Sequence, residues 1–145
     1  MSERPAPPTR DQFKQFYPIS TRWNDTDSYG HINNAVHYQL FDTAVNQWLI
    51  ETGLFDPAQS EAIGLVAETG CRYHGEILFP SVISVGLRIE HLGRSSVRYA
   101  IGLFADDREV AAADGFFVHV YVDRHTRRPV PISDSLRQAM SALQV

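Results

Sequence analysis

The sequence is poor in cysteine, since Cys71 is the only one among 145 residues and no disulfide can form within the chain. A lack of disulfides is typical of proteins in a reducing compartment. The sequence also has no run of about 18 apolar residues that could span a bilayer. Its first residues carry no charged stretch followed by an apolar core of the signal-peptide type. These absences predict a soluble cytoplasmic protein with no membrane partner.

Positive charge is scarce as well. The 13 lysines and arginines are outnumbered by 17 aspartates and glutamates, which gives a net charge of -4 and an isoelectric point near 5.8. Nucleic-acid binding would need a strong local basic patch, and none dominates the sequence. His31 and His37 are six residues apart and do not share a helical face, and no other His or Cys has recognisable metal-ligand spacing. We therefore expect no nucleic-acid partner, no metal and no cofactor.

Apolar residues are plentiful, at 43% of the sequence. This is enough to build a hydrophobic core without disulfides or a structural metal. Pro5, Pro7 and Pro8 lie among small and charged residues near the start, and such a segment buries too little to offset its ordering entropy. We expect a flexible tail over residues 1–12 and a single domain over residues 13–145.

A long helix is predicted near the start of this domain. Apolar residues recur every four positions from Val36 to Trp48, and Gly53 supplies a stop. Either side chain of the pair Asn33 and Asn34 can cap its beginning. Before it come a short strand over residues 16–23 and a polar, turn-forming segment over residues 24–31.

After the helix the apolar pattern changes to a period of two. It predicts four strands, over residues 64–73, 81–92, 97–103 and 110–122, followed by an amphipathic C-terminal helix over residues 133–143. In the first of these strands, Leu65, Ala67, Thr69, Cys71 and Tyr73 are expected to share one face. One strand, one helix and a meander of strands predict an α+β fold, with an antiparallel five-stranded sheet wrapped around one long central helix.

The segment that leads into the helix, RWNDTDSYGHINNAVHY over residues 22–38, resembles the 4-hydroxybenzoyl-CoA thioesterase-like family. The family pattern is Asp-x-Asp, a turn Gly, then His/Ile-x-Asn-Asn and a Tyr on the first turns of the helix. The match continues through Phe79-Pro80 and Val122-Asp123 and covers about residues 16 to 132. The resemblance implies a hotdog fold, hydrolysis of an acyl-CoA thioester to a free carboxylic acid and CoA, and a homodimer that often assembles into a homotetramer.

The resemblance also implies a site. It places the catalytic carboxylate on Asp27 and the oxyanion-binding amides at the helix start, around His31 to Asn34. A helix N-terminus carries unpaired N–H groups and the positive end of the dipole, which suits a developing oxyanion. Gly30 allows a tight turn, and His31 and Asn33 can orient Asp27 or a water molecule. Asp27 can serve as a general base or as a nucleophile, and both routes remain open.

Three further residues are predicted to bind the CoA nucleotide, whose phosphates call for cations. Arg124, Arg127 and Arg128 form the densest basic group of the sequence. Asp25 is expected to be structural, either bonding amides of the loop or pairing with Arg22. The aromatic-CoA enzymes of the family tend to carry a Tyr where this chain has Asn34, so the sequence does not specify the acyl group of the substrate. Acyl carrier protein also remains an alternative to CoA as the carrier of that group.

Two alternative functions keep the same fold. A hotdog dehydratase or hydratase would use His31 and Asp27 on an acyl thioester, but the signature Gly-Asp-x-Asn-Pro-x-His is absent. A non-catalytic module would bind an acyl thioester without hydrolysing it. Dimer and tetramer are equally compatible with the sequence.

Overall fold

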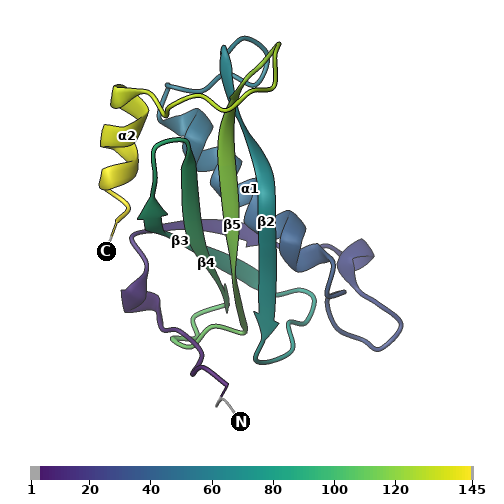
Figure 1. Cartoon of the computed structure of the whole chain (residues 1–145). Coiled ribbons are helices and arrows are strands. Elements are labelled where there is room, and N and C mark those ends of the chain that lie inside the picture. Colours follow the sequence, from purple (N-terminus) through teal and green to yellow (C-terminus); the bar gives the residue numbers. More distant parts are fainter. Residues whose placement is uncertain (1–3, 145) are drawn as a thin grey trace.

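The computed structural model describes residues 4–144 and contains one antiparallel sheet with a long helix against it (Figure 1). The strands are hydrogen-bonded in the order β1-β3-β4-β5-β2. In chain order the elements are η1 (Arg10–Gln12), β1 (Gln15–Ser20), η2 (Trp23–Asp25), α1 (Val36–Glu51), β2 (Ala62–Tyr73), β3 (Val82–Leu92), β4 (Ser96–Ala105), β5 (Ala113–Asp123) and α2 (Asp134–Ser141). The predicted α+β hotdog architecture is confirmed. The expected meander of four strands is wrong for β2, which pairs with β5 and not with β3, so that only β3, β4 and β5 follow one another in the sheet.

The helix α1 lies against one face of the sheet and forms the centre of the core (Figure 1). Its apolar stripe is broad because the buried positions recur at intervals of three and four. These positions are His37, Leu40, Phe41, Ala44, Val45, Trp48 and Leu49. The helix ends before Gly53, whose φ of 74° is a left-handed conformation that glycine adopts without strain.

The strands β3 and β4 supply the facing wall of the core. Their inward positions are at most 1% exposed, as the period of two predicted. They are Ile83, Val85, Leu87 and Ile89 in β3, and Val97, Tyr99, Ile101 and Leu103 in β4. Burial of each such side chain contributes about 1.5–3 kcal/mol, so the eight side chains of this wall together strongly stabilise the domain.

Strand β2 differs from the prediction because it contains a bulge. Its pairing with β5 shifts register between Val66, which opposes His119, and Glu68, which opposes Val118. An extra residue in one strand moves the following side chains to the other face. The predicted shared face is therefore wrong in its first part, since Leu65 lies on the opposite face from Thr69.

The N-terminal segment is held against the sheet in its second half. The Ala111 N–H donates to the Pro8 carbonyl at 2.9 Å, and the Arg10 N–H donates to the Glu109 carbonyl at 3.1 Å. Phe13 is buried on the outer face of the sheet. The prediction of a flexible tail is therefore corrected for residues 8–12, because these backbone bonds and the aromatic side chain order the segment. Residues 1–3 of that predicted tail lie outside the described residues.

The boundaries of two elements are marked by individual contacts, one between distant segments and one local. Strand β5 begins at Ala113, later than predicted, because Val110 forms an isolated bridge with Thr9. The C-terminal helix α2 begins after Ser133, whose Oγ accepts the Leu136 N–H at 3.3 Å and so caps the helix.

Candidate active site at the start of the central helix

The loop between η2 and α1 holds Asp27 in a fixed position. The Asp27 Oδ1 accepts the Tyr29 N–H at 2.8 Å, and the Asp27 N–H donates to the His31 carbonyl at 2.9 Å. Gly30 has a φ of 86°, so the tight turn requires a glycine there, as predicted. The Asp27 side chain is 16% exposed, which leaves the carboxylate ordered and still reachable.

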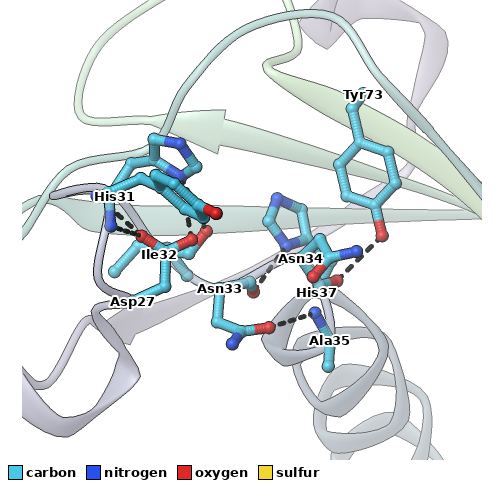
Figure 2. A network of polar contacts seen from close by, with 9 residues as sticks. Asp27, His31, Ile32, Asn33, Asn34, Ala35, His37 and Tyr73 are labelled. Atoms are coloured by element: carbon cyan, nitrogen blue, oxygen red, sulfur yellow. Dashed lines mark hydrogen bonds and ion pairs between the residues drawn. The ribbon is translucent and has the colours of Figure 1, made fainter.

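The imidazole of His31 lies beside this carboxylate (Figure 2). Its Nδ1 is 3.4 Å from the Asp27 Oδ2 and 3.4 Å from the Ile32 carbonyl. The loop therefore brings the predicted carboxylate and the predicted histidine together, in an arrangement that suits orientation of the carboxylate or of a water molecule.

Asp25 has the structural role that the sequence predicted. Its Oδ1 accepts the Arg22 Nη2–H at 2.8 Å and its Oδ2 accepts the Arg22 N–H at 2.8 Å. Burial alone would raise the pKa of Asp25, but the hydrogen bonds and charge of Arg22 outweigh it and hold that pKa below its usual value. The Asp25 carbonyl also accepts the Asn33 N–H at 2.9 Å, which ties the loop to the residues before α1.

The backbone N–H groups before α1 differ in whether they already donate a hydrogen bond within the chain. The Ile32 N–H donates to the Ile77 carbonyl, the Asn33 N–H donates to Asp25, and the Ala35 N–H donates to the Asn33 Oδ1 at 2.9 Å. The Asn34 N–H makes no hydrogen bond to any of residues 4–144. Among the amides predicted for the oxyanion, the Asn34 N–H is therefore the one best suited to donate a hydrogen bond to a ligand.

Two neighbouring hollows open at this end of the molecule. A cavity of about 340 Å³ is lined by His31, Ile32, Asn34, His37, Tyr73, His74, Gly75, Glu76 and Ile77. A second hollow, of about 310 Å³, is lined by Trp23, Asn24, Thr26, Asp27, Ser28 and Gly30. Asn34 lines the first hollow and Asp27 lines the second, and His31 and Gly30 lie on the loop between these two residues.

Two residues beside the helix start were not predicted. The Tyr73 hydroxyl donates to the Asn34 carbonyl at 2.8 Å, and the His37 Nδ1 lies 3.3 Å from the Asn33 carbonyl (Figure 2). Burial lowers the pKa of His37 and raises that of Tyr73, which keeps the imidazole neutral and the phenol protonated. The only sequence signal for Tyr73 was its place at the end of a predicted strand.

A close contact between His74 and Asp114 adjoins the same cavity. The His74 Nε2 lies 2.5 Å from the Asp114 Oδ1, and the His74 side chain is almost fully buried. Cys71, close by in the sequence, has a pKa raised to about 11 by burial. Its thiol is therefore protonated at neutral pH and is unsuited to act as a nucleophile.

The three predicted nucleotide-binding arginines lie at the other end of β2 and β5. Ala62 pairs with Asp123 there, whereas Tyr73 pairs with Ala113 at the end near Asp27, about 35 Å away along the strand. The Arg124 guanidinium donates to the carbonyls of Ser60, at 2.6 Å, and Pro57, at 2.8 Å. Within one subunit the structure does not bring the arginines to the Asp27 loop.

Residues 4–144 also bear on metal binding and on membrane insertion. No group of three or more His, Cys, Asp or Glu side chains gathers there in a way that could hold a metal ion. In the same part of the chain, no helix has both the length and the apolar character needed to cross a membrane.

Comparison with solved structures finds close similarity in sequence and fold. The PA5185 protein from Pseudomonas aeruginosa is 50% identical, with a TM-score of 0.92 over 95% of this chain and 96% of that one. The PA2801 protein of Pseudomonas aeruginosa, provisionally assigned as a thioesterase, is 28% identical, with a TM-score of 0.81 over 88% and 98% of the two chains. The gentisyl-coenzyme A thioesterase BH1999 shares the fold at 22% identity, with a TM-score of 0.76 over 87% and 99%.

No curated protein matches the sequence. The family model of the thioesterase-like superfamily matches residues 21–140, which include the Asp27 loop, α1 and all strands from β2 to β5. Because this match spans most of the domain, and the fold agrees with it, the chain belongs to the thioesterase-like superfamily.

Proposed function

We propose that this protein hydrolyses an acyl-CoA thioester to a free carboxylic acid and CoA, with Asp27 as the catalytic carboxylate. The observation that carries the proposal is the pairing of an ordered, reachable carboxylate at Asp27 with an unoccupied amide at Asn34, at the positive end of α1. Thioester hydrolysis needs a base or nucleophile and a donor for the oxyanion, and this loop supplies one of each. The similar fold of a gentisyl-coenzyme A thioesterase supports CoA as the donor to test first.

In the general-base route, Asp27 takes a proton from water as the water oxygen adds to the thioester carbonyl carbon. The carbonyl oxygen becomes an oxyanion and is bound by the Asn34 N–H. The carbon–sulfur bond then breaks, and the proton passes from Asp27 to the leaving thiolate. In the nucleophilic route the Asp27 carboxylate adds to the carbonyl carbon, and the carbon–sulfur bond breaks to release the CoA thiolate and leave an anhydride. Water then cleaves the anhydride to the free acid and Asp27, and its second proton goes to the thiolate. A single turnover in heavy-oxygen water distinguishes the routes, because only the second can leave the label in Asp27.

A homodimer formed through strand β2 is part of the proposal. β2 has 12 residues and lies at the edge of the sheet, where Leu65 is 40% and Val66 is 49% exposed. A long apolar edge strand is a template for pairing with a second copy. Antiparallel pairing of two β2 strands would bring the arginine end of one subunit beside the Asp27 end of the other, where Arg127 and Arg128 could meet the CoA phosphates.

Free-thiol release from a panel of short, long, branched and aromatic acyl-CoA esters tests the activity. We expect turnover by the wild type and a loss of about 100-fold or more in kcat for Asp27→Asn. Asp42→Asn, an equal change on the exposed face of α1, serves as the matched control and should leave kcat unchanged. No thiol release from any ester by the wild type would refute the proposal and favour a non-catalytic binding module or hydration chemistry.

The mass in solution tests the dimer. We expect at least twice the 16.4 kDa of one chain in analytical ultracentrifugation. Replacing Leu65 and Val66 together with Lys places charge on the edge and should return the mass to a monomer. A wild-type monomer that is fully active would contradict the shared site.

A further inference from the structure

The peptide unit that carries the Asn34 N–H is anchored by its carbonyl end. The Asn33 carbonyl accepts the Val36 N–H at 2.9 Å and faces the His37 Nδ1 at 3.3 Å. A carbonyl can only accept, so His37 carries its proton on Nδ1 and donates it. In a trans peptide the N–H points opposite to the carbonyl. The Asn34 N–H is therefore directed away from the helix.

The next peptide unit is anchored as well. The Asn34 carbonyl accepts the Tyr73 hydroxyl at 2.8 Å, and the Ala35 N–H on the same unit donates to the Asn33 Oδ1 at 2.9 Å. Figure 2 shows both anchors, with Tyr73 reaching the helix start from β2. Both units that flank the Asn34 α-carbon are fixed, so rotation of the free N–H would break at least one of these bonds.

The two anchoring side chains also support each other. The His37 and Tyr73 rings pack edge to face, with their centroids 4.8 Å apart, and His37 is 3% exposed. Both residues line the 340 Å³ cavity together with Asn34. A buried and mutually packed pair can hold a backbone amide more rigidly than a solvated loop can.

We propose that Tyr73 and His37 are positioning residues that hold the Asn34 N–H in the direction needed by the thioester oxyanion. This rests on the proposed function, since the oxyanion forms only if a thioester is attacked. Neither side chain touches the reacting atoms, and both act through the backbone of Asn33 and Asn34. A preorganised donor stabilises the transition state more than the ground state, so its disorder lowers kcat and leaves substrate binding largely intact.

Tyr73→Phe removes only the hydroxyl and is the primary test. We expect kcat to fall about 10-fold or more, since complete loss of an oxyanion donor costs about 100-fold to 1,000-fold, while KM stays within about twofold. Tyr17→Phe is the matched control. It removes a hydroxyl that donates to the Glu51 Oε2 at 2.8 Å, at the other end of α1, and should leave kcat unchanged.

His37 is tested by a pair of variants. His37→Leu removes the Nδ1 donor and should lower kcat in the same way as Tyr73→Phe. His37→Asn keeps an N–H at nearly the same position and should restore much of the loss. An equal kcat in His37→Leu and His37→Asn would overturn the role of His37. If the side chain only filled space, a variant with an N–H donor and a variant without one would behave alike.

A thioether analogue of the substrate, which lacks the carbonyl oxygen, separates positioning from pocket shape. We expect equal Kd for this analogue in the wild type and in Tyr73→Phe. If Tyr73→Phe raised the Kd of the analogue by the same factor by which it lowered kcat/KM, Tyr73 would instead shape the pocket. That result would overturn the inference. Unchanged kcat in Tyr73→Phe beside an active wild type would also overturn it and leave the proposed function standing. An inactive wild type would refute the proposed function and the inference with it.

Discussion

The Nδ1 of His31 lies 3.4 Å from the Oδ2 of Asp27, across a turn in which the Asp27 N–H donates to the His31 carbonyl. The two side chains are thus linked both directly and through the backbone. Groups linked in this way act as a unit in catalysis, and their mutational effects are not additive.

A double-mutant cycle on this pair should show strong coupling. We expect His31→Asn to lower kcat about 10-fold and Asp27→Asn to lower it by about 100-fold or more. The double variant should be no less active than Asp27→Asn alone, because His31 has no carboxylate left to orient. Steady-state thiol release measures all three variants. Losses that multiply would mean that the two residues act independently.

The turn at Gly30 should be specific for glycine for conformational reasons. Its φ is 86°, and an added Cβ would meet no heavy atom within 4 Å. Gly30→Ala should therefore lower the free energy of unfolding by about 1–2 kcal/mol through backbone strain alone. Gly75→Ala is the matched control, since that position has equal space and no positive φ. Urea unfolding should show Gly75→Ala to be neutral or slightly stabilising. Equal effects in both variants would contradict the assignment of strain to Gly30.

Stability should fall as the pH is lowered because of His119. Burial lowers the pKa of this residue to about 4, and its Nδ1 makes no hydrogen bond within residues 4–144. The unfolded chain, with a usual pKa of about 6.5, binds the proton first, so the free energy of unfolding falls between about pH 6.5 and pH 4, by about 3 kcal/mol.

His119→Leu tests this assignment. The variant should match the wild type at pH 7, or exceed its stability, because an unpaired buried nitrogen is removed. Urea titrations at several pH values should show a flatter dependence in the variant. A wild type and a variant with the same dependence would assign the acid sensitivity to other groups.

The arginine group should divide into a structural and a ligand-binding part. Arg124 donates to two backbone carbonyls, so Arg124→Ala should lower Tm. Arg127 and Arg128 are exposed, and replacing both with Gln should raise KM for acyl-CoA while leaving Tm unchanged. The control substrate is the same acyl group on N-acetylcysteamine, which has no nucleotide. An equal rise in KM for both substrates would contradict a role in phosphate binding.

Local pattern was sufficient for much of the fold. The four-residue spacing from Val36 to Trp48 predicted α1, and the alternation in β3 and β4 predicted which side chains share the inward face, because both periods follow from backbone geometry alone. The motif around Asp27 and Gly30 likewise identified a candidate loop, since its turn chemistry and its place before a helix are properties of adjacent residues.

The sequence by itself determined the helix, the strands and the loop that carries Asp27, whereas the place of β2 beside β5 was decided by the tertiary structure. Only the tertiary structure decided that the bulge in β2 separates Leu65 from Thr69, that residues 8–12 pack on the sheet, and that Tyr73 reaches Asn34. The physical reason is that a repeat along the chain reports which face a side chain occupies, whereas a hydrogen bond between residues 39 positions apart depends on how strands and helix pack. Packing sums many weak contacts over the whole domain, and no short segment encodes that sum.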